Sequence, residues 1–479
     1  MQHQHKLMSA KPTLNAEQTE AFKAIKKFLE HHSVNTFVLK GYAGTGKTFL
    51  MQHLGKWLEE TETAFCMLAT TGRAATVLRG KTGFTAKTVH SEVYNFSKIE
   101  GIEGPDYRGI DPVNKNGQMT MQFLTRVPDA AENKIVYIVD EASMLSGHLS
   151  TDNKFATYGS GVILDDFFEV AGKNKIIFVG DPCQLPPVRQ TFSPALDMDW
   201  LAQKNRHAIS FTLQTIERTD SSNDILKLAT SLRQISLQNA SPHNKKIPAA
   251  HLNNVKLHAN NKELFNAYLK RYRQKGINNV LAIARSNEMV QNINKAMRRD
   301  LFGNKDMPLQ VGDVLLVTQN NYSVPLTNGD FVTIIQLGEF RPKGILRFQK
   351  VTVKAVATDL EYTILLSLDA MANINGNLTD EQQTYLMIDF NKRMDNKKVT
   401  FNSEIYKKSM RDDAYLNSLR ATYGYAVTCH KAQGGEWNDV FLFLESSVFY
   451  MKHPEQSKWC YTSVTRAKQE LNVVAGWCE

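Results

Sequence analysis

The chain has 479 residues, of which 42% are hydrophobic and 22% are charged, and this composition excludes a wholly disordered or collagen-like protein. Lysine and arginine outnumber aspartate and glutamate by 57 to 48, so the net charge of +9 is compatible with a polyanionic partner but does not establish one. The five cysteines form no CxxC pair, and no apolar run reaches about 18 residues. We therefore expect reduced thiols, a cytoplasmic protein and no membrane span.

The first half of the chain alternates short apolar runs with helical patterns. Leu50, Leu54, Trp57 and Leu58 lie at helical spacing and predict a helix soon after the first run. Continuous apolar runs are typical of strands covered on both faces, as in a parallel sheet. The predicted strands are residues 37–39, 65–69, 135–139 and 176–179.

The second half of the chain shows the same alternation of apolar runs and helical patterns. Residues 280–284 predict a strand, and Met289, Ile293 and Met297 mark one face of a helix that follows it. Two further strands are predicted near the end, at residues 440–444 and 471–475. Strands that alternate with helices indicate two α/β cores.

Two stretches interrupt this alternation. The first follows Tyr94 and is rich in Gly, Pro and Asn, and the second has β-like runs with an Asn328-Gly329-Asp330 turn signal between two of them. We interpret them as a small insert in the first core and a β-barrel-type insert in the second. The predicted division is 1–93 and 131–212 for the first core, 94–130 for its insert, 213–310 and 413–479 for the second core, and 311–412 for the barrel.

A phosphate-binding loop is predicted between the first strand and the helix after it. Residues 41–48 read GYAGTGKT and fit the pattern G-x4-G-K-[ST]. Backbone N–H groups of Gly44, Thr45 and Gly46 can wrap phosphates, and the cation of Lys47 can reach the terminal phosphates. The hydroxyl of Thr48 suits Mg²⁺. The pattern therefore predicts ATP and Mg²⁺ as ligands.

Polar side chains follow two other predicted strands. Asp140 and Glu141 end one strand, and Gln184 lies in the loop after another. At the carboxyl edge of a parallel sheet, Asp140 can hold Mg²⁺ through water and Glu141 can orient or deprotonate the attacking water. Gln184 can contact the γ-phosphate. The alternatives are a solvated strand end and a proline-stiffened loop without a ligand.

The order of these motifs resembles the superfamily 1 helicases of the RecD/Dda type. DEAS at 140–143 and GDPCQLPPV at 180–188 carry the resemblance, and TCHKAQGGE at 428–436 and YTSVTRA at 461–467 resemble motifs V and VI of that family. Gln18 resembles its adenine-reading glutamine, TTGRAA at 70–75 its motif Ia, and Arg218 its motif IV arginine. The resemblance spans residues 18 to 467, nearly the whole chain.

The resemblance implies an α/β fold with two RecA-like P-loop NTPase domains, a small pin-type insert in the first and a β-barrel (SH3-like) insert in the second. ATP would lie between the domains. Arg466 is then the first candidate for a catalytic cation delivered by the second domain, and Arg218 is the second candidate. Gly435 and Glu436 are candidates for nucleotide contacts, as is Gln18.

The resemblance also implies contacts with single-stranded DNA. The candidate residues are Thr70, Thr71, Thr88 and His90 on the first core and Thr428, His430 and Lys431 on the second. In the first insert, any of Tyr94, Phe96, Tyr107 and Phe123 could act in a duplex-splitting pin or belong to a small hydrophobic cluster. The basic stretch at 392–411 is favoured as a solvated face over a DNA path.

The function expected from these features is that of a monomeric ATP-dependent DNA helicase. It would move along single-stranded DNA, 5′-to-3′ if the resemblance holds, and would unwind tailed duplex DNA. One alternative is a DNA-stimulated ATPase that translocates or remodels without strand separation. The other is a nucleotide-gated binding module whose hydrolysis is vestigial.

Overall fold

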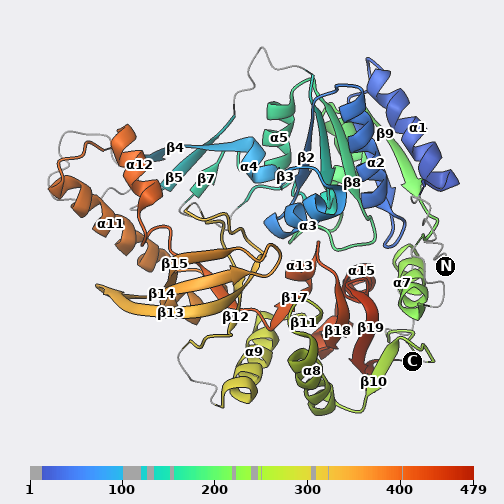
Figure 1. The fold of residues 1–479 in the computed structure, drawn as a ribbon. Helices are drawn as coiled ribbons and strands as arrows, with labels where there is room; N and C mark the ends of the chain where they lie inside the picture. The colour runs from blue at the N-terminus through green and yellow to red at the C-terminus, as the bar shows by residue number, and fades with distance from the viewer. Residues whose placement is uncertain are drawn as a thin grey trace, which may run out of the picture.

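The computed structural model describes residues 13–100, 120–126, 134–150, 156–217, 223–238, 246–249, 251–303, 309–321, 323–401 and 403–478. Two parallel sheets with helices on both faces form its two main bodies, called here the first and second lobes (Figure 1). This α/β arrangement fits two RecA-like domains, as the sequence predicts. Among the described helices, none is long and apolar enough to cross a membrane.

The first lobe is built on a six-stranded sheet in the order β3-β2-β6-β8-β1-β9, and each strand runs parallel to its neighbours. All four predicted strands are present, whereas the edge strands β3 and β9 were not predicted. The strands are β1 Thr36–Gly41, β2 Phe65–Ala69, β3 Ala86–Thr88, β6 Val136–Asp140, β8 Lys175–Gly180 and β9 Ala208–Leu213.

Helices cover both faces of this sheet. Val38 belongs to one hydrophobic cluster and its neighbour Leu39 to another, because successive side chains of a strand point to opposite faces. That double burial explains why the strands are continuously apolar. The helices are α1 Ala16–Glu30, α2 Lys47–Glu60, α3 Gly72–Thr82, α4 Val89–Val93, α5 Ile163–Ala171 and α6 Met198–Gln203.

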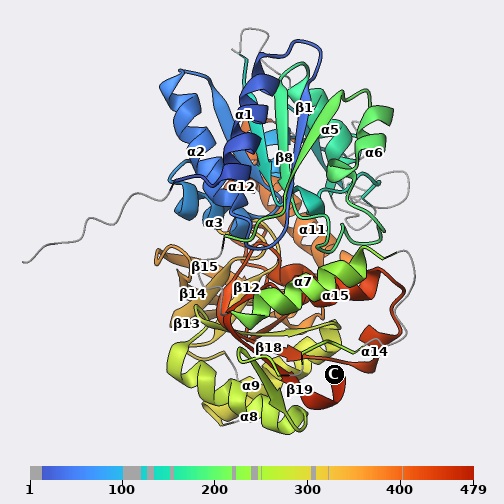
Figure 2. The same cartoon turned by 90° about the vertical axis from the view of Figure 1, so that its right-hand side faces the viewer.

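The second lobe has a five-stranded parallel sheet in the order β10-β19-β18-β11-β17. Its strands are β10 Val255–His258, β11 Val280–Ala284, β17 Ala426–Thr428, β18 Trp437–Phe443 and β19 Ala467–Val474. Its helices are α7 Asp224–Ser236, α8 Asn261–Lys275, α9 Asn287–Phe302, α13 Cys429–Ala432, α14 Ser446–Phe449 and α15 Glu455–Val464. The two lobes lie one above the other (Figure 2), and α3 lies directly above α13 across the seam (Figure 1).

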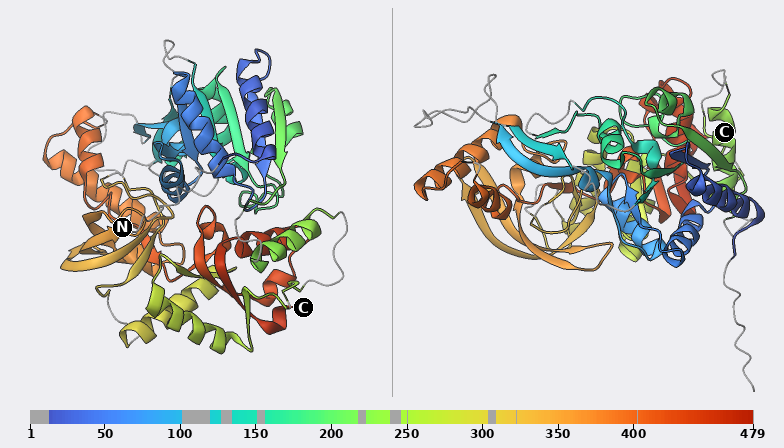
Figure 3. Two further views of the ribbon diagram at one scale, coloured as in Figure 1. Left: turned by 45° about the vertical axis from the view of Figure 1, so that its right-hand side comes forward. Right: turned by 90° about the horizontal axis from the view of Figure 1, so that it is seen from above.

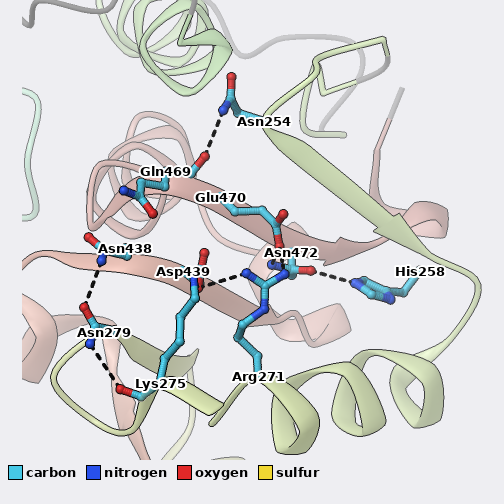
Figure 4. Close-up of polar contacts among 10 residues, drawn as sticks. All are labelled: Asn254, His258, Arg271, Lys275, Asn279, Asn438, Asp439, Gln469, Glu470 and Asn472. Atoms are coloured by element: carbon cyan, nitrogen blue, oxygen red, sulfur yellow. Dashed lines mark hydrogen bonds and ion pairs between the residues drawn. The ribbon is translucent and has the colours of Figure 1, made fainter.

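A polar network fastens α8 to strands β18 and β19 (Figure 4). Asp439, whose side chain is 1% exposed, accepts from Arg271 at 3.1 Å and from Lys275 at 2.8 Å. Arg271 also pairs with Glu470 at 3.1 Å. The buried carboxylate is thus matched by two cations, as a buried charge requires.

The first insert contributes a small sheet of β4 Tyr94–Glu100, β5 Thr120–Thr125 and β7 Ala156–Tyr158. Strand β7 lies beyond the predicted limit of 130. Tyr94 is buried in the hydrophobic cluster of the first lobe, and its hydroxyl donates to Asp166 at 2.6 Å. Tyr107 and the side chains of Phe96 and Phe123 lie outside the described residues.

The second insert contains a five-stranded sheet in the order β15-β14-β13-β12-β16, and each strand runs antiparallel to its neighbours in the sheet. Its strands are β12 Val314–Val317, β13 Phe331–Lys343, β14 Leu346–Ala355, β15 Glu361–Ser367 and β16 Ala421–Tyr423. Both inserts lie on the same side of the molecule (Figure 3).

Helices inside the second insert were not predicted. They are α10 Leu368–Ala372, α11 Asp380–Asn396 and α12 Glu404–Asp412. A capping box between Thr379 and Gln382 starts α11, and Leu386, Phe390 and Met394 form its buried face at helical spacing. The sequence carries both signals for a helix, but they follow a series of β-like runs that favours strands.

The basic stretch of the second insert lies on α11 and α12. Arg393 pairs with Asp389 at 2.8 Å, and Lys407 pairs with Glu404 at 3.0 Å. The remaining cations, Lys392, Lys397, Lys398, Lys408 and Arg411, are exposed. This placement agrees with the favoured interpretation of a solvated face.

Candidate nucleotide cleft at the lobe seam

Three loops of the first lobe meet at the carboxyl edge of its sheet. Strands β6, β8 and β1 are neighbours, so Asp140 at the end of β6, the loop with Gln184 after β8 and the glycine-rich loop after β1 lie side by side. Ligands of open α/β sheets bind at this edge. The fold therefore gathers chemical groups that are more than 130 residues apart in the chain.

The glycine-rich loop has the backbone that its sequence demands. Gly44 and Gly46 have φ values of 83° and 77°, in the left-handed region that favours glycine. A Cβ at Gly46 would lie 2.4 Å from Nε2 of Gln18. That nitrogen donates to the carbonyl of Thr45 at 3.1 Å, so Gln18 braces the loop from the first turn of α1.

Lys47 begins helix α2 at the end of the loop. Its Nζ donates to the carbonyls of Gly41 at 2.8 Å and Tyr42 at 3.1 Å. The N-terminus of α2 adds positive potential, because its first N–H groups point out of the helix. A cation, free N–H groups and flexible glycines together suit a polyphosphate.

Asp140 and Glu141 face the same cleft. An Asp140 carboxylate oxygen accepts from the Glu141 N–H at 2.9 Å, and Glu141 adopts a left-handed φ of 51°, which is uncommon and costly outside glycine. Burial, with the nearby Glu141 carboxylate, raises the pKa of Asp140. The Asp140 carboxylate and the Thr48 hydroxyl are hard oxygen donors that fit Mg²⁺, which usually takes few protein ligands beside substrate phosphates.

The second lobe completes a cleft of about 630 Å³. Arg466, which is 4% exposed, lines it together with Lys47. The Arg466 guanidinium donates to the carbonyls of Thr462 at 3.0 Å and Gly435 at 3.1 Å. Of the predicted site residues, the lining also includes Gln18, Gly44, Gly46, Thr48, Asp140, Glu141, Gln184 and Glu436.

A few predicted residues stand apart from this lining. Thr45 and Gly435 are buried next to the cleft but are not among its lining residues. Arg218 lies outside the described residues, so its placement stays a prediction. Its neighbour Glu217 lines the cleft and donates its N–H to the carbonyl of Gly44 at 2.9 Å.

The DNA-contact candidates of the first lobe lie at the starts of helices. Thr71 caps α3 and Thr88 caps α4, so each hydroxyl accepts from a backbone N–H. Thr70 donates to Sδ of Met144 at 3.6 Å. His90 is exposed beside the rings of Tyr94 and Tyr158, with centroid distances of 5.8 and 6.1 Å.

The candidates of the second lobe lie around α13. Thr428, His430 and Lys431 are half-buried there. Burial lowers the pKa of His430 below its usual value, with a smaller contribution from Arg285, and burial lowers that of Lys431. The imidazole is therefore mostly neutral at pH 7 and can stack or accept a hydrogen bond.

No role was predicted for Arg73, which the structure places across the seam. Its guanidinium lies 4.3 Å from the ring of Trp437 and 4.8 Å from the ring of Phe331, both from the second half of the chain. Burial lowers its pKa to about 10, and its Nε has no hydrogen-bond partner among the described residues. An arginine inside the motif Ia run was the available signal, but its aromatic partners are more than 250 residues away.

Comparison with known proteins matches two families on this chain. The family described as AAA domain matches residues 13–243, and the family described as UvrD-like helicase C-terminal domain matches residues 423–474. An uncharacterized protein R530 of Acanthamoeba polyphaga mimivirus is 21% identical over 513 residues, covering 95% of this chain and 99% of that protein.

Similar solved structures include two Pif1 helicases. The Candida albicans Pif1 helicase has a TM-score of 0.43 at 16% identity and covers 97% of this chain and 95% of that one. The Bacteroides sp Pif1 in complex with ADP-AlF4 has a TM-score of 0.39 at 14% identity and covers 98% and 94%.

The two family matches fall on the two lobes that form the cleft. The first includes the phosphate loop, Asp140 and Gln184, and the second includes the segment from His430 to Arg466. One lobe thus carries an ATPase domain and the other a helicase C-terminal domain. With an AAA domain match in one lobe and a helicase C-terminal match in the other, the chain is an ATP-hydrolysing, nucleic-acid-binding helicase.

Proposed function

We propose that this DNA helicase translocates along single-stranded DNA in the 5′-to-3′ direction and separates the strands of tailed duplex DNA. The observation that carries the proposal is the common cleft of Lys47 and Arg466, which come from opposite lobes. A nucleotide in this cleft would contact both lobes at once. Its binding and hydrolysis can therefore close and open the seam against which the DNA-contact candidates lie.

The first lobe binds and orients the nucleotide in this proposal. Gln18 contacts the base, the loop from Gly44 to Thr48 wraps the phosphates, and Lys47 neutralises their charge. Glu141 orients or deprotonates the attacking water. Mg²⁺, held by Thr48 and by Asp140 through water, would supply further charge neutralisation at the phosphates.

The second lobe supplies the cation of the transition state. Charge spreads over the γ-phosphoryl oxygens during transfer, and a guanidinium placed there stabilises that charge more than it stabilises the bound substrate. Arg466 fits this role because three bonds within the second lobe hold its guanidinium at the cleft. Arg218 is the second candidate.

DNA contacts on both lobes convert the opening and closing of the seam into translocation along the strand. Thr70, Thr71, Thr88 and His90 grip the strand from the first lobe, and Thr428, His430 and Lys431 grip it from the second. Hydroxyl and N–H groups bind phosphate without reading sequence, which suits a motor that crosses any sequence. Strand contacts that favour the closed seam would also stimulate ATP turnover, since such coupling is reciprocal for binding.

We also propose a monomeric state and the domain division given above, with β7 added to the first insert and β16 to the second, because each pairs with a strand of that insert. The SH3-like barrel is supported by a bridge between Leu366 and Leu419, which brings the segment before β16 back to the end of β15. Such a contact between opposite edges of the sheet is what closure into a barrel requires.

Directional unwinding tests the proposal. Duplexes with a 5′ tail, with a 3′ tail and with an RNA strand are compared for strand release, beside ATP turnover with oligo-dT, and Lys47→Ala serves as the inactive control. Release from the 5′-tailed DNA alone supports the proposal. DNA-stimulated turnover without strand release favours the remodelling ATPase, and no turnover with Mg²⁺ favours the binding module.

A further inference from the structure

Tyr461 reaches from the second lobe into the first lobe. It lies on α15, five residues before Arg466, and is 1% exposed. Its hydroxyl donates to a carboxylate oxygen of Asp181 at 2.6 Å and accepts from the N–H of Ala43 at 2.9 Å. Burial raises the pKa of Tyr461 well above its usual value, so the hydroxyl keeps the proton that it donates.

The two partners of this hydroxyl belong to the two loops that face the nucleotide. Ala43 lies in the phosphate loop, directly before Gly44. Asp181 accepts from the N–H of Cys183 at 2.9 Å, and its carbonyl accepts from the N–H of Gln184 at 3.2 Å. One phenol thus bridges the phosphate loop and the turn that presents Gln184.

Neighbouring contacts tie that turn to the second lobe. The Leu185 N–H donates to the hydroxyl of Thr462 at 2.9 Å, and its carbonyl accepts from Gln433 at 3.2 Å. Cys183 and Leu185 pack in the hydrophobic core of the second lobe. The Arg466 guanidinium bonds to the carbonyl of Thr462, so the same end of α15 holds the Gln184 turn and the arginine.

We propose that Tyr461 is a positioning residue that sets the register of the two lobes, so that Arg466 reaches the cleft only when the phosphate loop and the Gln184 turn are aligned. This inference rests on the proposed role of Arg466. Loss of the hydroxyl leaves a buried carboxylate and a backbone N–H without that partner when the lobes are closed. The closed state that performs hydrolysis is then weakened, while nucleotide binding to the first lobe is retained.

Tyr461→Phe tests the inference with a matched control. The variant is expected to lower kcat for DNA-stimulated ATP turnover by at least about 10-fold, with KM for ATP within about threefold, because the lost bond acts on the closed state. Tyr268→Phe removes another buried phenol that bonds only within its own lobe, to the carbonyl of Tyr425, and is expected to keep kcat. Both variants are compared for melting temperature, since a merely structural role would lower stability without the selective loss of kcat.

A double-mutant cycle locates the effect. Asp181→Ala is expected to lower kcat, and adding Tyr461→Phe is expected to lower it little further, because both remove one interaction. Additive losses, or a Tyr461→Phe variant with normal kcat, would overturn the inference. Arg466→Ala is measured in parallel to separate the two proposals. If Arg466→Ala retains full ATP turnover, the proposed cation role of Arg466 is wrong. If Arg466→Ala is defective but Tyr461→Phe has normal turnover, only the positioning role of Tyr461 is wrong.

Discussion

The seam between the lobes and the network that holds α8 to its sheet are both buried and polar, yet they are built differently. In the network, Asp439 has two cationic partners and Arg271 has two carboxylate partners. At the seam, Nε of Arg73, Oε1 of Gln184 and Oε1 of Gln433 are buried without a hydrogen-bond partner within the described ranges.

This difference in pairing bears on which of the two buried surfaces can separate. Complete pairing makes separation costly, because each exposed charge loses its partner. Incomplete pairing leaves atoms that water or a ligand can satisfy, so we expect separation at the seam to cost less free energy for each buried polar group. The network therefore stabilises one lobe, and the seam is suited to a nucleotide-dependent switch.

The largest effect is expected from Lys47→Ala at the seam. The variant should abolish ATP turnover, because the phosphates lose their cation, while single-strand binding is largely retained. A radioactive or coupled phosphate-release assay and fluorescence anisotropy with oligo-dT measure the two properties. Lys56→Ala, on the exposed part of the same helix, is the control, and turnover retained by Lys47→Ala would contradict the phosphate-loop assignment.

Arg466→Ala is expected to lower turnover roughly 10³-fold or more with little loss of nucleotide affinity, because a transition-state cation contributes mainly to the rate. Steady-state kcat and equilibrium titration with a fluorescent ATP analogue separate the two quantities. Arg299→Ala, a 54% exposed arginine of the same lobe, should match the unmodified protein. Equal losses of affinity with a normal rate would remove the role.

Asp439→Ala probes the network instead. Removal of the shared carboxylate should lower the free energy of unfolding by about 2 kcal/mol. This loss is smaller than the loss expected when a fully buried ion pair is broken, because water reaches both cations. Urea denaturation followed by circular dichroism measures the loss, and Glu20→Ala, from an exposed pair with Lys23, should show no measurable change. A rate defect without a stability loss would place Asp439 in the motor rather than in the scaffold.

The smallest effect is expected from Arg73→Met. Loss of stacking on Trp437 and Phe331 opposes relief from burying a cation whose Nε has no hydrogen-bond partner among the described residues, so the free energy of unfolding should change by less than about 1 kcal/mol. The same urea titration checks this value against Asp439→Ala. If Arg73→Met destabilised the protein as much as Asp439→Ala, the contrast between seam and network would be lost.

The sequence predicted the interior strands of both parallel sheets and most residues of the cleft, but not the edge strands. Apolar runs such as residues 280–284 have few structural options, and the phosphate loop needs its glycines and Lys47 in one contiguous run. Edge strands such as β3 and β9 are short or half-exposed, so they contain no continuous run of apolar residues that would predict a buried strand. Helix α11 had clear caps and a buried face, yet it followed four β-like runs and was missed.

The chemistry of each loop can be predicted from residues that are adjacent in the sequence. A phosphate-binding loop and a carboxylate at the end of a strand each consist of such adjacent residues. Which loops meet depends instead on how the two lobes fold and pack together. Tyr461 with Ala43 and Arg73 with Trp437 join residues more than 350 positions apart, and the packing of two separate hydrophobic cores brings them together. No local pattern encodes such a distance, since it depends on how the whole of each lobe folds.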